Sequence, residues 1–167
     1  MTNYKPTRPT LAFYHANCRV TGSAAKFELH PAHDSEEGSI LLVMANQATC
    51  TPQTPVPCFD WENAITAKLG FADICKMLQV LRGETESIDD GRGLFHATVT
   101  ATTKIALRHI IEPVQAYSLE VYSCERGGGN GVSSHILLTS AEALGLFMAL
   151  ENVMGLIAFG CNAPTVA

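Results

Sequence analysis

The order of the hydrophobic patterns constrains the fold of this chain more than any single motif does. Residues 59–69 alternate between apolar and polar side chains, as a half-buried strand does, and the apolar ones are Phe59, Trp61, Ile65, Ala67 and Leu69. The period then changes to the helical spacing of Phe71, Ile74, Leu78 and Leu81. Gly83 follows, and glycine readily adopts the left-handed conformation that ends a helix. A strand that runs directly into a helix is therefore expected at the end of the first half.

Three further strands are expected before this one. Residues 11–20 can form a strand, and Thr21 to Ser23 have the composition of a turn. The next segment, up to residue 32, places Ala25, Phe27 and Leu29 on one face and Lys26, Glu28 and His30 on the other. Residues 39–47 are almost continuously apolar, which is typical of a strand buried on both faces. Residues 33–38 are a polar hairpin loop, and the proline-rich residues 49–58 are an irregular loop.

The same order returns after a polar connector at residues 84–93. Residues 94–110 alternate throughout, and their length predicts two strands or one strongly bent strand, with Phe95, Ile105 and Leu107 among the side chains on the core side. Residues 116–125 form another strand, the glycine-rich residues 126–131 form a loop, and residues 133–139 form the last strand. Residues 139–142, TSAE, match a capping box, and the helical stripe that follows continues to Gly160.

Strands that precede each helix, rather than alternate with it, predict an α+β fold made of two repeats of a four-stranded antiparallel sheet followed by a helix. We expect one domain at residues 11–160, with halves at 11–83 and 94–160. Residues 1–10 are predicted to be a flexible arm and residues 161–167 a tail. The second helix carries Leu144, Met148 and Leu156 beside its main stripe, which predicts contact between subunits, as a homo-oligomer such as a dimer or tetramer.

Composition narrows the class of protein. A chain of 167 residues with 47% hydrophobic content can bury a full core. Its apolar runs look too short to span a bilayer and its first residues lack a signal peptide, so a cytoplasmic protein without membrane association is expected. The six cysteines include no C-x-x-C pair and are predicted to be reduced and mostly structural. The net charge of -5 argues against a protein that coats duplex DNA, but a groove for a single strand needs only a few well placed cations.

Several segments, in order along the chain, resemble the Whirly family of single-stranded-DNA-binding proteins. TGSAAKFELHP at residues 21–31 is similar to the family's second-strand motif, lysine-glycine-lysine-alanine-alanine-leucine, with which it shares Gly22, Ala24 and Ala25. FDW at residues 59–61, followed by Lys68 and FADICKML, is similar to the family's strand that leads into its first helix. FHATVTATTKIALRHIIEP at residues 95–113, then YSLEV and TSAEALGLF, is similar to the later strands and the start of the second helix. The resemblance covers roughly residues 18–160.

This resemblance implies two repeats of four strands and a helix, assembly into tetramers through the helices, and binding of single strands along sheet surfaces between subunits. The chain also departs from the family motif. Thr21 and Ser23 stand where the family has lysines, and Lys26 stands where the family usually has leucine. The missing lysines bear directly on DNA affinity and on any higher assembly associated with the motif.

Binding a single strand requires cations along its phosphates and flat rings for its bases. Four cations lie on the polar parity of their strands and are the candidates for phosphate contacts: Lys26, Lys68, Lys104 and Arg108. Tyr14 and Tyr122 are the candidate stacking residues, whereas Trp61 shares its parity with Ile65 and is expected in the core. The alternative interpretation is that these side chains are ordinary solvated strand residues.

The sequence predicts no catalytic site, metal site or cofactor. His30 and His33 lie in a loop with an intervening proline and lack a third ligand, no local signature pairs a cysteine with a histidine, and the loop at residues 126–131 lacks the G-K-[ST] of a phosphate loop. We therefore expect a protein that binds single-stranded DNA, or RNA, with little sequence specificity, in transcription, replication or repair. The alternative is an oligomeric protein-interaction module that keeps the fold without binding nucleic acid.

Overall fold

The computed structural model of the chain describes residues 8–33, 36–49, 56–127, 129 and 131–160. The predicted arm falls outside the described residues except for residues 8–10, and the predicted tail falls wholly outside them. Most of the proline-rich loop, residues 50–55, also lies outside.

The first half forms an antiparallel sheet followed by a helix. Its elements are β1 (Thr10–His15), β2 (Ser23–His30), β3 (Ser39–Ala48), β4 (Cys58–Phe59), β5 (Ile65–Leu69) and α1 (Phe71–Leu81). The strands β1, β2 and β3 pair in order, and β3 then pairs with both the short β4 and β5. Gly83 has a φ of 76°, and the amide of Glu84 donates to the carbonyl of Gln79, so the predicted glycine ends α1.

The second half repeats this plan. A short 3-10 helix, η1 (Ile88–Gly91), precedes β6 (Leu94–Ala97), β7 (Ala101–Ile110), β8 (Ala116–Glu125) and β9 (Val132–Thr139), which form a four-stranded antiparallel meander. The helix α2 (Ser140–Phe159) begins at the predicted capping box, where the hydroxyl of Thr139 accepts from the amide of Glu142. Two antiparallel sheets, each followed by a helix, confirm the predicted α+β class.

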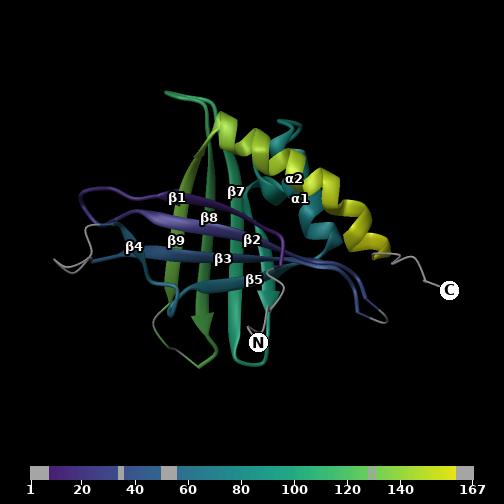
Figure 1. The fold of residues 1–167 in the computed structure, drawn as a ribbon, viewed down its shortest axis with the longest axis horizontal. Coiled ribbons are helices and arrows are strands. Elements are labelled where there is room, and N and C mark those ends of the chain that lie inside the picture. The colour runs from purple at the N-terminus through teal and green to yellow at the C-terminus, as the bar shows by residue number, and fades with distance from the viewer. Residues whose placement is uncertain (1–7, 34–35, 50–55, 128, 130, 161–167) are drawn as a thin grey trace, which may run out of the picture.

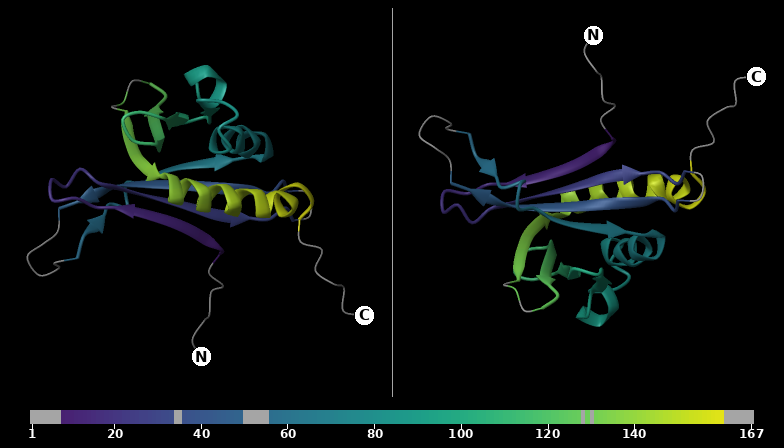
Figure 2. Two further views of the ribbon diagram at one scale, coloured as in Figure 1. Left: turned by 90° about the horizontal axis from the view of Figure 1, so that it is seen from above. Right: turned by 90° about the horizontal axis from the view of Figure 1, so that it is seen from below.

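The strands of the second sheet run across those of the first, and the two helices lie side by side at one end of the molecule (Figure 1). The view from above places the first sheet on one side of the molecule and the second sheet with α1 on the other (Figure 2). The inner faces of both sheets and the inner faces of both helices share one hydrophobic core, which includes Phe27, Leu42, Met77, Leu119 and Leu146. The outer face of each sheet is left to solvent or to a partner.

The structure corrects the single strand predicted over residues 59–69. Phe59 in β4 pairs with Gln47 on the outer face of β3, whereas Ile65 in β5 pairs with Met44 on the inner face. The register between the two short strands therefore shifts by an odd number of residues, and such a shift moves side chains to the opposite face. The predicted strand is two strands, and the expected alternation holds only from Ile65 onward.

The long alternating segment at residues 94–110 is also two strands, as one of the two predicted alternatives had it. Leu94 pairs with Ile105 across the hairpin, and both are buried. Phe95 pairs with Lys104 and is 63% exposed, so its predicted place on the core side is wrong. Residues paired across a hairpin point to the same side of the sheet. The prediction counted residues along one continuous strand and did not take this pairing into account.

The helices differ from expectation in detail. In α1 the buried side chains are Ile74, Met77, Val80 and Leu81, whereas Phe71, predicted for the same stripe, is 50% exposed. The polar connector contributes Ile88 of η1 to the core. In α2 the predicted stripe is confirmed, with Ala143, Leu146, Leu150 and Ile157 buried.

The expectation that all apolar runs are too short to span a bilayer is wrong for α2. By length and composition, Ser140–Phe159 is apolar enough to cross a membrane, with a mean hydropathy of 1.5 over its best window. The apolar character of α2 comes from two sources, because one face packs on the core while Leu144, Met148 and Phe159 remain exposed on another. Leu156, predicted to lie beside the main stripe with Leu144 and Met148, is instead partly buried against the core.

Candidate nucleic-acid interface

The outer face of the first sheet carries a cluster of three aromatic rings, Tyr14, Phe59 and Trp61. The ring centroids of Tyr14 and Phe59 lie 5.7 Å apart, and Trp61 lies 6.4 Å from Tyr14 and 6.3 Å from Phe59. Tyr14 is 56% exposed, so the cluster is open to solvent. Ala24 and Ala45 occupy the same row of the sheet as Tyr14, and these small side chains leave room for the rings above them. We call these three residues the aromatic cluster.

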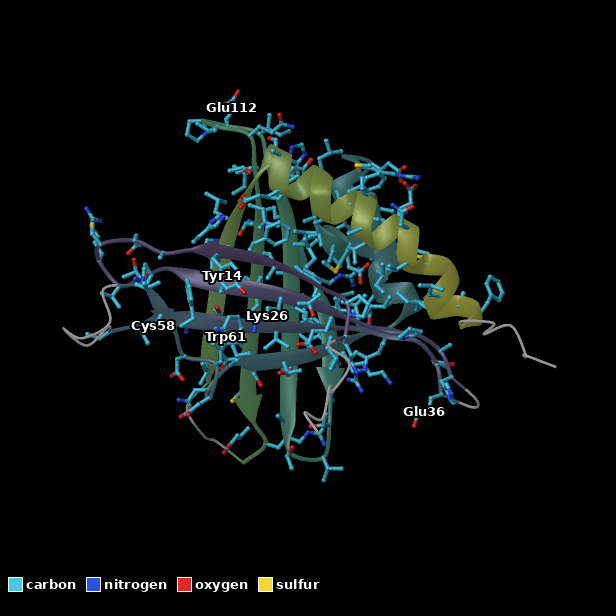
Figure 3. All side chains as sticks on the ribbon, in the orientation of Figure 1. Tyr14, Lys26, Glu36, Cys58, Trp61 and Glu112 are labelled. Atoms are coloured by element: carbon cyan, nitrogen blue, oxygen red, sulfur yellow. The ribbon has the colours of Figure 1, made fainter. Side chains whose placement is uncertain are left out.

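Trp61 belongs to this cluster and not to the core, which corrects its predicted place. The chain makes a local turn between β4 and β5, which both run antiparallel to β3; here the amide of Trp61 donates to the carbonyl of Phe59 and that of Asn63 donates to the carboxylate of Asp60. The indole lies on the outer face beside Tyr14 and Lys26, and Figure 3 shows all three side chains together. The Lys26 ammonium lies 3.7 Å from the centroid of the Trp61 ring, a cation–π contact.

Positive charge continues along the same face beyond the aromatic cluster. Lys68 is exposed on β5, in the same row as Glu28 of β2. Arg8 reaches His30 at the end of β2, with the guanidinium nitrogen within 2.9 Å of the imidazole ring nitrogens. Burial lowers the pKa of His30, and the nearby charges of Arg8 and Lys68 lower it further against the opposing effect of Glu28. Arg8 and Lys68 thus place two cations near His30, with the Glu28 carboxylate 4.0 Å from its Nε2.

The second sheet has a matching arrangement on its own outer face. Lys104 of β7 lies between Phe95 of β6 and Tyr122 of β8 in one row, and its ammonium is 5.5 Å from the centroid of the Phe95 ring. Tyr122 is 42% exposed, and a hydrogen bond with the Cys124 thiol raises the pKa of its phenol. Arg108 lies exposed on the same face of β7, four residues further along.

The six candidate residues therefore fall into two groups of three. Tyr14, Lys26 and Lys68 share the outer face of the first sheet, and Lys104, Arg108 and Tyr122 share that of the second. All six lie on outer faces, as their parity predicts, and their role in binding stays a prediction. Sequence reasoning placed Phe95 and Trp61 in the core, and the registers that bring them to the outer faces have no local sequence signal.

The two positions where lysines are absent have structural roles. Ser23 is buried, and its hydroxyl donates to the carbonyl of His135 in β9, so it joins the two sheets. The hydroxyl and amide of Thr21 both donate to the side-chain oxygen of Asn17 within the turn. Between them, a β-carbon at Gly22 would lie 2.1 Å from the carbonyl oxygen of His15. The backbone thus approaches closely here, and Ser23 cannot serve as a surface contact.

The remaining candidates for a functional site are metal ligands and cysteines. Across the described residues there is no group of three or more His, Cys, Asp and Glu side chains that could hold a metal ion. Cys18 is exposed, and Cys58, Cys75 and Cys124 are half-buried, so these four lie outside the hydrophobic core, and the prediction that the cysteines are reduced and mostly structural stays a prediction. Cys50 and Cys161 lie outside the described residues.

Comparison with solved structures identifies the architecture. The chain is similar to WHY1 from Arabidopsis thaliana, with a TM-score of 0.74 and 16% identity over 91% of this chain and 86% of that one. It is also similar to the plant transcriptional regulator PBF-2, with a TM-score of 0.70 and 17% identity over 90% of this chain and 82% of that one. The chain has a Whirly-like fold. A guide-RNA-binding protein complex bound to guide RNA matches more weakly, with a TM-score of 0.61 and 14% identity over 88% of this chain and 90% of that one.

The Whirly-like fold was expected from the ordered motifs, although no protein-family model and no curated protein sequence matches the chain. The fold accounts for the two crossed sheets. The aromatic cluster of the first sheet, and the row of Phe95, Lys104 and Tyr122 in the second sheet, are formed by this chain's own side chains.

Proposed function

We propose that this protein binds single-stranded DNA on the outer faces of its two sheets, with little sequence discrimination and without catalysis. The observation that carries the proposal is that each sheet presents a lysine against an aromatic ring on its outer face, Lys26 at the half-buried Trp61 and Lys104 at the exposed Phe95. Rings can stack on any base, and the neighbouring ammonium groups can follow the phosphates, a combination typical of single-strand binding without sequence preference.

The similar structures support a nucleic-acid ligand in general. One of them is described as bound to guide RNA and another as a transcriptional regulator. RNA is therefore the natural competitor of DNA for this surface, and the binding experiment has to include both. The roles in transcription, replication or repair and the cytoplasmic location stay predictions.

The test is fluorescence anisotropy with labelled single-stranded DNA, single-stranded RNA and duplex DNA of mixed sequence across a salt series. We expect the single strands to bind more tightly than the duplex, with affinity that falls as salt rises. Replacing Lys68, Lys104 and Arg108 together by alanine should reduce the slope of log affinity against log salt by about 2, since each single-strand phosphate contact contributes about 0.7. Lys76→Ala is the control, because this lysine on α1 pairs with Asp89 and lies on neither outer face.

An unchanged slope in the triple variant would remove these three cations from the interface. Failure of the unaltered protein to bind any single strand at low salt would refute the proposal as a whole.

The second candidate function is an oligomeric protein-interaction module, and the exposed apolar face of α2 favours it. Leu144, Met148 and Phe159 are 59%, 53% and 86% exposed, more apolar surface than a solvated helix usually presents. We propose that this face mediates self-association, and Leu144→Glu with Met148→Glu should then yield smaller particles in light scattering. An unchanged mass would contradict that role. Assembly without oligonucleotide binding would favour the interaction module over the proposed function.

A further inference from the structure

A histidine of the first sheet reaches the helix that follows the second sheet. His15 is the last residue of β1, and its Nε2 lies 2.7 Å from Oε1 of Glu142 in the first turn of α2. The other oxygen of Glu142 accepts hydrogen bonds from the amide and the hydroxyl of Thr139, the residue that caps α2. One carboxylate thus caps its own helix and holds a strand of the opposite sheet.

The reverse connection is made in the other half. His96 lies in β6, the first strand of the second sheet, and its Nε2 is 3.0 Å from Oδ2 of Asp73 in the first turn of α1. The same oxygen of Asp73 accepts from the amide of Gly70, which caps α1. Asp73 and Glu142 both occupy the third position of their helices, so the two contacts are equivalent in the two halves.

Both histidines lie next to a ring on the outer face. Tyr14 precedes His15 and Phe95 precedes His96, and because side chains alternate along a strand each ring points outward while its histidine points inward. Both strands are also sheet edges among the described residues, where β1 pairs only with β2 and β6 only with β7. An edge strand has backbone bonds on one side only and frays more readily than a central one.

We propose that His15 and His96 are positioning residues that clamp the edge strands β1 and β6 to the opposite helices and thereby hold Tyr14 and Phe95 in place for stacking. The last step rests on the proposed function, whereas the clamp itself does not. A hydrogen bond to an ionised carboxylate is stronger than a neutral one, and each of these pairs is about a quarter to a third exposed, which limits its screening by water. Each clamp ties the inner face of an edge strand to a helix.

Trp61 makes the clamp measurable, because it is the chain's single tryptophan and lies 6.4 Å from Tyr14. The experiment compares His15→Ala, His15→Gln and His96→Ala by hydrogen exchange and by Trp61 fluorescence, first without ligand and then with a single-stranded oligonucleotide. His15→Ala should speed amide exchange in β1 by about tenfold, shift the Trp61 emission of the free protein and raise the oligonucleotide concentration for half-maximal quenching by about tenfold.

Glutamine keeps an N–H donor at a similar reach. In His15→Gln, the amide exchange rate of β1 and the oligonucleotide concentration for half-maximal quenching should therefore return to the values of the unaltered protein. His96→Ala is the matched control: it should speed exchange in β6 but leave the Trp61 emission of the free protein unchanged. The clamp is refuted if His15→Ala leaves β1 exchange unchanged, or if His96→Ala alters Trp61 emission as much as His15→Ala does, which would indicate general loosening.

The two proposals can fail separately. If oligonucleotide does not quench Trp61 in the unaltered protein, stacking at the aromatic cluster is refuted, while exchange and free-protein emission still decide the clamp. If the oligonucleotide quenches Trp61 equally in the unaltered protein and in His15→Ala, while β1 exchange rises, then the clamp holds the strand without positioning the ring.

Discussion

Replacing Trp61 by alanine should weaken single-strand binding and cost less stability than the removal of an aromatic residue from the hydrophobic core. The indole lies outside the hydrophobic core and contacts two rings of the aromatic cluster and the Lys26 ammonium. An aromatic pair contributes about 0.5 to 1.5 kcal/mol and an exposed cation–π contact about 0.5 to 1 kcal/mol. Two ring pairs and one cation–π contact together predict a fall of about 1.5 to 4 kcal/mol in the free energy of unfolding, whereas removal of a core aromatic costs about 3 to 5 kcal/mol.

The loss in binding follows from stacking. One base stacked on an aromatic ring contributes about 1 to 3 kcal/mol, which corresponds to about 5- to 150-fold in the dissociation constant. The slope of affinity against salt should not change, because the indole carries no charge.

Two measurements check this prediction. Urea unfolding followed by circular dichroism gives the stability, because the variant has lost its fluorescent reporter, and oligonucleotide anisotropy at several salt concentrations gives the affinity. Phe71→Ala is the control, since Phe71 is a half-exposed aromatic residue on α1 and lies on neither sheet. A stability loss above about 4 kcal/mol with unchanged affinity would refute the placement of Trp61 on a binding face and return it to the core.

Two further predictions concern the fold. Gly22→Ala should destabilise the protein by about 1 to 3 kcal/mol, because the new methyl group would overlap the carbonyl of His15. The control is Gly145→Ala on α2, where the methyl group meets open space and the change should be neutral or stabilising. Equal urea midpoints for both variants would contradict the close approach at Gly22. Burial alone would raise the pKa of Glu142, but hydrogen bonds from His15 and Thr139 lower that pKa overall. The ionised carboxylate therefore stabilises the fold at pH values above the ordinary pKa of about 4.5, and this stabilisation is lost as the pH falls through the lower pKa of the folded state. Glu142→Gln should therefore be less stable than the unaltered protein at pH 7, with a difference that shrinks below pH 4.5 in urea titrations; a difference independent of pH would contradict this assignment.

The elements that the sequence predicted well are those with local causes. The end of α1 was predictable because Gly83 adopts a left-handed conformation, and the start of α2 because the Thr139 hydroxyl and the Glu142 carboxylate satisfy each other's backbone amides. The outward direction of Lys68 and Arg108 was predictable because alternation within one strand is fixed by its backbone.

The candidate site was predictable only in part. Parity placed the four cations and two tyrosines on outer faces, but it assigned Phe95 and Trp61 to the core. Parity is reliable only along an unbroken strand, and each of these residues belongs to a separate short strand or turn whose register depends on its pairing partner. Neither turn contains the glycine or proline that would have marked it in the sequence.

The sequence by itself determined the order of strands and helices, the helix ends and the two-fold repetition, because periodicity, capping and turn chemistry act over a few residues. Only the tertiary structure decided that the sheets cross, that Trp61 and Lys26 meet on one outer face, and that His15 and His96 each bind the carboxylate that caps the opposite helix. The partners in these contacts are up to 127 residues apart, and what brings them together is the burial of one core shared by both halves.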